Sequence, residues 1–291
     1  MTAARDLLIL NPNTSTGVSH LLAGAAQDAA ARAGLGPVRV EVLTARFGAP
    51  YIACEASYAV AGHAVLDLWA AHRASPEHCA TPADPADPAD RTHPADAATS
   101  WQPPAPDAIL IGCFGDPGLH ALREVAGVPV TGLAEAAFTE AARLGRYAVV
   151  TGGTRWAPML QRLAAGLGLA DGLRGIHTVA PSGAQLAADR TAAIALLTEA
   201  CRAAVAQARA RDGTDALQAL ILGGAGLAGL AAEIQPALDL PLICSVEAGV
   251  RQAVGRADAV RGAAKTSAEP GLWCALAGVS TELTAWARPT A

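Results

Sequence analysis

The sequence predicts an α/β protein made of two similar lobes, and three observations support this expectation. Short apolar runs alternate with longer helical stretches along the 291-residue chain. Motifs of the first half recur in the second half. Hydrophobic residues make up 52% of the chain and charged residues 16%, which excludes disorder of the whole chain. The length suits two lobes of about 100–150 residues each.

The apolar runs are expected to be buried strands of parallel sheets, because each is short and ends in a loop that opens a helical stretch. They cover residues 7–10, 38–43, 108–111, 147–150, 217–222 and 241–243. Helices are expected at residues 18–33, 56–72, 119–125, 134–144, 157–167 and 184–208. This alternation indicates parallel sheets with helices on both faces.

Residues 75–106 interrupt the alternation with closely spaced Pro, Ala and Asp residues. Because this composition cannot build a core, we expect an exposed loop inserted before the strand at 108–111. A lid or a partner-binding tail remains an alternative interpretation of the insertion.

Three pairs of motifs indicate an internal duplication. The segment 7–14 resembles 147–154, the segment 109–115 resembles 220–226, and Val128-Pro-Val resembles Leu240-Pro-Leu. The sequence offset of the first pair exceeds that of the other two by about the length of the insertion. We therefore expect a first lobe of residues 1–145 plus 257–291 and a second lobe of residues 146–256.

The loops at 11–15, 112–118, 151–155 and 223–229 each follow a predicted strand. Ligands of parallel sheets bind beyond the carboxyl ends of the strands, so these loops are expected to line one cleft between the lobes. The first loop can cap a helix and bind a small anion through free N–H groups, although turn chemistry explains the same residues. Its candidate binding residues are Asn11, Asn13, Thr14 and Ser15.

Cys113, in the second loop, has the most favourable setting of the six cysteines. It ends a predicted strand just before a helix, where the helix dipole and backbone N–H groups are expected to lower the pKa of its thiol. A thiolate there can act as a base or a nucleophile, whereas the alternative is a small residue that fills a strand end. Phe114 and Gly115 follow it as candidate binding residues.

The second-lobe loops offer backbone and hydroxyl donors to the same cleft. Residues 224–229 match the dinucleotide pattern G-x-G-x-x-G, but the related first-lobe loop has no such pattern, so a tight turn beside a ligand is favoured. The candidate binding residues of these loops are Thr151, Gly152, Thr154, Gly224, Ala225 and Gly226.

These loops resemble those of the aspartate/glutamate/hydantoin racemase superfamily, at residues 8–15, 112–119, 128–137, 149–160, 222–227 and 265–267. The resemblance implies two pseudo-symmetric Rossmann- or flavodoxin-like lobes, no cofactor and a homo-oligomer. It also implies one cysteine from each lobe: one thiolate removes the α-proton and the opposite thiol returns a proton to the other face. By this likeness Cys113 is the first-lobe acid or base, while Asn13, Thr14, Thr151 and Thr154 bind a carboxylate or imide oxygen.

The sequence departs from this pattern at Gly224, where the second cysteine should stand. The leading hypothesis is a cofactor-independent racemase or isomerase that transfers a proton at a carbon next to a carboxylate or hydantoin carbonyl through one cysteine. Arylmalonate decarboxylases are relatives with one cysteine, so a decarboxylase of a malonate-type substrate is an alternative. A non-catalytic protein that binds a small anion is another.

Composition limits the other partners. The net charge of −5 and the lack of a basic block argue against nucleic acid. No apolar run approaches the ~18 residues of a membrane span, and the first apolar run is too short for a signal peptide, so a cytoplasmic protein is expected. No cysteine has metal-binding spacing, so we expect no metal site. The expected partner is a small carboxylate or hydantoin-like molecule.

Overall fold

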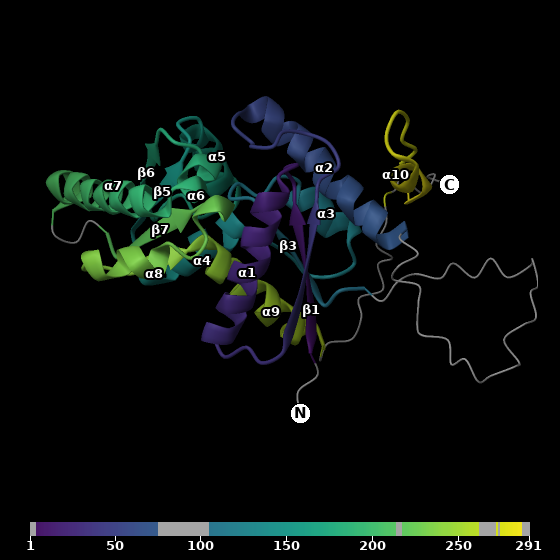
Figure 1. Cartoon of the computed structure of the whole chain (residues 1–291), viewed down its shortest axis with the longest axis horizontal. Coiled ribbons are helices and arrows are strands. Elements are labelled where there is room, and N and C mark those ends of the chain that lie inside the picture. The colour runs from purple at the N-terminus through teal and green to yellow at the C-terminus, as the bar shows by residue number, and fades with distance from the viewer. Residues whose placement is uncertain (1–3, 75–104, 214–216, 262–271, 273, 287–291) are drawn as a thin grey trace, which may run out of the picture.

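The computed structural model describes residues 4–74, 105–213, 217–261, 272 and 274–286. Most of the predicted insertion at 75–106, with Cys79 inside it, lies outside the described residues, as does the segment 265–267. The two lobes and the helices between them are drawn in Figure 1.

Each lobe contains a parallel sheet of four strands, and the strand order is the same in both. The first sheet has the order β2-β1-β3-β4, with β1 (Arg5–Asn11), β2 (Val38–Thr44), β3 (Ala108–Ile111) and β4 (Val130–Gly132). The second has the order β6-β5-β7-β8, with β5 (Tyr147–Gly152), β6 (Leu173–Val179), β7 (Ala219–Gly223) and β8 (Leu242–Cys244). The repeated order confirms the predicted duplication and the α/β fold class.

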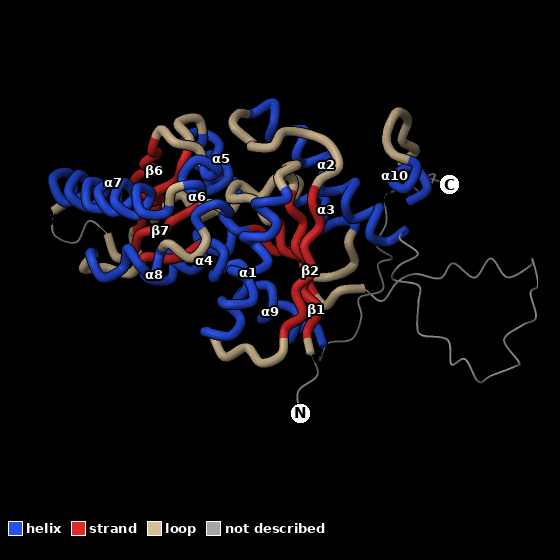
Figure 2. The backbone as a smooth tube through the Cα atoms, in the orientation of Figure 1, coloured by secondary structure: helices blue, strands red, loops and turns tan. Residues whose placement is uncertain are grey.

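Helices cover both sheets and fill the space between them, as Figure 2 shows. Their bounds are α1 (Thr16–Arg32), α2 (Glu55–Ala74), α3 (Leu119–Val125), α4 (Leu133–Leu144), α5 (Trp156–Gly166), α6 (Gly183–Ala188), α7 (Arg190–Asp212), α8 (Ala231–Ile234), α9 (Ser245–Arg261) and α10 (Thr281–Trp286). Helices α4 and α9 pack on each other and α9 contacts both β3 and β7, so the lobes share one interior. A single apolar cluster accordingly contains residues of both sheets.

Several elements differ from the sequence expectation. The predicted helix at 184–208 is two helices, because the Asp189 side chain accepts a hydrogen bond from the backbone N–H of Ala192 and starts α7 there. Strand β6 was not predicted, since Arg174, Gly175 and His177 interrupt its apolar pattern. Strand β4 and helices α8 and α10 were also missed, and of α9 only a helix start near Glu247 was expected. The expected lobe boundary at 256/257 falls inside α9.

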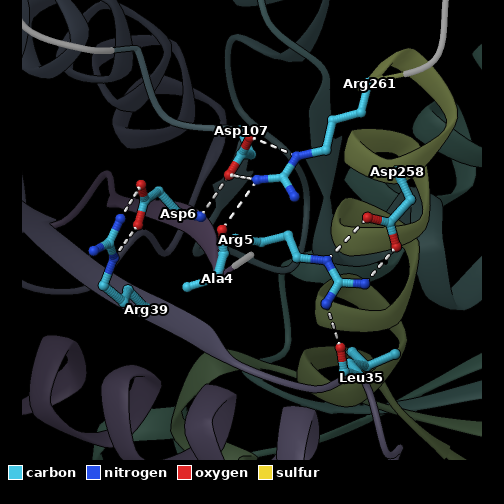
Figure 3. Close-up of polar contacts among 8 residues, drawn as sticks. All are labelled: Ala4, Arg5, Asp6, Leu35, Arg39, Asp107, Asp258 and Arg261. Atoms are coloured by element: carbon cyan, nitrogen blue, oxygen red, sulfur yellow. Dashed lines mark hydrogen bonds and ion pairs between the residues drawn. The ribbon is translucent and has the colours of Figure 1, made fainter. Parts of the chain in front are cut away.

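Ion pairs join α9 to the amino-terminal edge of the first sheet, the edge opposite the predicted binding loops (Figure 3). Arg5 of β1 donates to both carboxylate oxygens of Asp258 at 2.9 and 2.8 Å. Arg261 donates to Asp107 at 3.1 and 2.8 Å, and Asp107 also accepts from the backbone N–H of Asp6 at 2.8 Å. The carboxyl-terminal half of α9 is thus tied to the first lobe.

The packing of α9 can be tested with two glycines of this helix. A Cβ at Gly249 would lie 2.8 Å from Leu133 Cδ2 and 3.0 Å from Leu110 Cδ1, whereas a Cβ at Gly255 would meet nothing within 4 Å. Gly249→Ala should therefore lower the free energy of unfolding by about 1–3 kcal/mol through overpacking. Gly255→Ala should raise it by about 0.5–1 kcal/mol, because alanine is the better helix former. Urea denaturation measures both, and equal effects would contradict this packing.

Candidate functional site

The loops that follow β1, β3, β5 and β7 meet around one pocket between the lobes. Its cavity has a volume of about 60 Å³. Since one water needs about 10–15 Å³ of such volume, the cavity has room for a few waters or a similarly small molecule. The structure thus brings the four predicted loops together, at the carboxyl ends of the strands.

Cys113 lies at this pocket, in the loop between β3 and α3, and is 7% exposed. The expectation of a lowered thiol pKa is wrong. Burial, and then the negative charge of Asp116, raise the pKa of Cys113 well above its usual range. Helix α3 begins only at Leu119, too far along the chain for its dipole to oppose these two effects. Cys113 is therefore a protonated thiol at neutral pH in the free protein.

Asp116 anchors the loop that carries Cys113, a role that the sequence analysis missed. It is buried, has a φ of 55°, and accepts the backbone N–H groups of Ala134 and Glu135 at 2.9 and 2.7 Å. These groups begin α4, whose positive end favours a carboxylate. Burial nevertheless outweighs the hydrogen bonds and raises the pKa of Asp116 to about 7. Gly132 leaves the space for this carboxylate, because a Cβ there would overlap it.

The first loop divides into one pocket residue and three supporting residues. The Asn13 side chain belongs to the pocket lining and accepts the Ser15 N–H at 2.9 Å. Asn11 is fully buried beside the pocket, where its amide donates to Ser15 O at 3.1 Å and Ser19 Oγ at 2.9 Å. Ser15 caps α1 through the N–H of Val18, as predicted. Asn11, Thr14 and Ser15 do not line the pocket, so capping and turn chemistry account for Asn11 and Ser15.

The other predicted residues also separate into two groups. Phe114, Thr151, Gly152, Gly224, Ala225 and Gly226 line the pocket. Thr154 is exposed and lies outside the lining, while Gly115 is buried under the Trp156 ring. The Phe114 ring occupies the space beside Gly223 that a side chain there would need.

The sequence analysis missed a fifth contribution to the pocket, from the loop between β2 and α2. Pro50, Tyr51 and Ile52 of this loop line the cavity, together with Gly183 at the start of α6. The loop follows the carboxyl end of β2, so the rule that selected the other four loops would have selected this one as well. Its residues carry no motif that singled them out.

The pocket is uncharged. Among the described residues that line it, the polar side chains are Asn13, Tyr51, Cys113 and Thr151, together with the indole N–H of Trp156, and none is an ion at neutral pH. Glu135, the other carboxylate at the start of α4, is paired with Arg123 and Arg256 at 2.5 and 3.1 Å. The described part of the chain holds no group of three or more His, Cys, Asp or Glu residues placed to bind a metal ion.

A protein-family model, described as Asp/Glu/Hydantoin racemase, matches residues 7–253. The chain belongs to this family. The match spans both sheets and the loops around the pocket, and it confirms the resemblance seen in the sequence.

Relatives of this racemase-family chain match it in sequence and in structure. A hydantoin racemase of Pseudomonas sp. (strain NS671) is 36% identical over 146 residues, 50% of this chain and 56% of that protein. A hydantoin racemase of Rhizobium meliloti is 35% identical over 148 residues, 50% of this chain and 58% of that protein. These alignments thus cover little more than half of each relative. The solved allantoin racemase from Klebsiella pneumoniae has a TM-score of 0.72 and 25% identity, over 96% of this chain and 99% of that one.

No helix in the described part of this family member is long and apolar enough to cross a membrane. Helix α2 begins next to Cys54, which is partly exposed. The backbone N–H and the hydroxyl of Ser57 stabilise the Cys54 thiolate and lower its pKa, and Sγ lies 3.6 Å from the Ser57 oxygen. The pKa of Cys54 is therefore lower than that of an ordinary thiol, whereas the pKa of Cys113 is higher.

This contrast predicts the order of alkylation in the racemase-family protein. At about neutral pH, iodoacetamide should modify Cys54 at least ~10-fold faster than Cys113, because the thiolate is the reactive form of cysteine. Cys113 is both buried and protonated. Mass spectrometry of digested protein at successive times measures both rates. Cys54→Ser serves as the control in which the labelling of Cys113 is followed without competition from Cys54. Equal rates, or faster labelling of Cys113, would contradict the assigned pKa directions.

Proposed function

We propose that this protein is an isomerase that inverts the carbon next to the carbonyl of a small, neutral, hydantoin-type ring, with Cys113 exchanging the proton. The observation that carries this proposal is an uncharged pocket between the lobes with a thiol in its wall. The names of the relatives, hydantoin racemase and allantoin racemase, support the same substrate class.

The lack of charge selects among substrates. An amino-acid carboxylate or a malonate would bring one or two negative charges into a buried site without a cationic side chain, which is costly unless each charge is paired. A hydantoin ring instead presents neutral N–H and C=O groups. The Asn13 amide, the Thr151 hydroxyl and the backbone N–H groups of Ala225 and Gly226 can pair with such groups. The pocket thus supports an imide ring over an acidic substrate.

The chemistry that follows needs only proton transfer. When a base takes the proton from the ring carbon, the C–H electron pair moves into the adjacent carbonyl and forms an enolate. Hydrogen-bond donors fixed around that oxygen stabilise the charge as it develops. Return of a proton to the opposite face then gives the other enantiomer. Cys113, as a thiol of raised pKa, is a proton donor in the free protein and a strong base once ionised.

The proposal is tested with one enantiomer of a 5-substituted hydantoin in D₂O. We expect the wild type to invert the substrate and to place deuterium at the inverted carbon. Chiral chromatography measures the inversion, and NMR measures the deuterium. Cys113→Ala should lower the rate by about 10²–10⁴-fold, the usual contribution of an acid–base group. Cys201→Ala, which removes a buried thiol of α7 outside the pocket, is the matched control and should keep the rate.

Other outcomes would overturn the assignment. Release of CO₂ from a malonate, without inversion of hydantoins, would identify a decarboxylase. Binding of a small anion, measured as thermal stabilisation without turnover or exchange, would identify a binding protein.

The activity should also depend on pH in a definite direction. Because burial and Asp116 raise the pKa of Cys113, its thiolate forms only under alkaline conditions, and kcat/KM should increase with pH above neutrality. Asp116→Asn removes the negative charge, so it should move this increase to lower pH. The pH profiles of both proteins measure the shift. An unchanged or more alkaline profile in the variant would contradict the role of Asp116.

A further inference from the structure

Tyr51 is the other titratable side chain among the described residues that line the pocket with Cys113. Inversion needs a proton-transfer group on each face of the carbon, and the second-lobe loop has Gly224 where the resemblance calls for a thiol. The backbone at Gly224 has a φ of 141°, which residues with side chains rarely adopt. The second proton must therefore pass through a different group.

The Tyr51 side chain crosses from the first lobe to the second. It belongs to the loop between β2 and α2, yet its hydroxyl oxygen contacts groups of the second lobe. The indole N–H of Trp156 donates to this oxygen at 3.2 Å, and the hydroxyl donates to Gly152 O at 3.3 Å. The hydroxyl thus lies against the second lobe, whereas Cys113 belongs to the first.

The surroundings of this oxygen suit a phenol that gives up its proton and takes it back. The indole N–H of Trp156 is directed at the oxygen and can stabilise a phenolate as a donor of an oxyanion site does. The phenol's own hydrogen goes to a carbonyl at the long distance of 3.3 Å, so a substrate can replace that acceptor at little cost.

Gly153 supports the same arrangement from the neighbouring loop. It has a φ of 91°, and a Cβ at this position would overlap the Tyr51 oxygen. Gly153 thus leaves the space in which the phenol oxygen lies, while Gly152 offers it a carbonyl acceptor. Burial raises the pKa of Tyr51, which keeps it protonated at neutral pH and ready to donate.

We propose, on the basis of the proposed function, that the Tyr51 hydroxyl is the proton donor and acceptor for the face of the carbon opposite Cys113. In one direction the Cys113 thiolate forms an S–H bond with the substrate proton, and the C–H electron pair enters the carbonyl. The enolate then forms a C–H bond with the Tyr51 proton on the other face and leaves a phenolate. In the other direction the phenolate takes the proton and the Cys113 thiol returns one.

The test compares Tyr51→Phe with Tyr147→Phe in D₂O. The control removes a phenol that donates to Leu169 O at 2.6 Å, outside the pocket. We expect Tyr51→Phe to lower inversion at least ~100-fold, the smaller contribution of an acid–base group, while Cys113 still exchanges the proton of one enantiomer with retention. Tyr147→Phe should invert and exchange both enantiomers at the wild-type rates. Exchange without inversion separates a lost proton donor from a damaged pocket, because damage would lower both.

Three results would overturn the proposal. Wild-type inversion rates in Tyr51→Phe would exclude Tyr51 as the second group. Exchange with full retention in the wild type would show a one-base enzyme, which removes the need for Tyr51 but leaves proton transfer by Cys113 intact. Absence of both exchange and inversion in the wild type would overturn the proposed function and this assignment together.

Discussion

The contact between Phe114 and Gly223 fixes how the two lobes face each other. Phe114 directly follows Cys113, and its ring fills the space that a side chain at Gly223, the last residue of β7, would occupy. The ring then packs edge-on against Phe138 of α4 at 5.9 Å, and Phe138 contacts Tyr147 of β5 at 5.9 Å. This aromatic row joins the lobes beside the pocket, so the first-lobe loop that carries Cys113 has a fixed position relative to the second lobe. Buried aromatic pairs of this kind stabilise the contact between the lobes and favour a defined ring geometry.

Much of the fold could be predicted because it depends on local pattern. Buried parallel strands such as β1, β3 and β7 are short apolar runs, and their duplication gave the lobes and the loops that meet at the pocket. Strand β6 carries Arg174 and His177, and α9 has two glycines and several charges, so neither shows the pattern of its class. Their identity comes from tertiary packing, which a local pattern does not record.

The site was predictable in position but less so in chemistry. Strand ends located Cys113, Asn13 and Thr151, since the rule is topological. The ionisation of Cys113 depends on burial by both lobes and on Asp116, whose carboxylate is held by the first turn of α4. Tyr51 lies in the pocket because its side chain extends from the first lobe to Gly152 and Trp156 of the second. Such facts belong to the assembled molecule, and no spacing along the chain encodes them.

The two ends of the interface between the lobes are held by different kinds of contact. Helix α9 starts beside the second sheet and is bound to the first by Arg5, Arg256 and Arg261. At the pocket end, the exposed pair of Glu55 and Arg162 joins the lobes, and such pairs are worth about 0–1 kcal/mol. A separation of the lobes at the pocket end must break this pair, the packing of Phe114 on Gly223 and the hydrogen bond from Tyr51 to Gly152 O, whereas a separation at the other end must free the arginine contacts of α9.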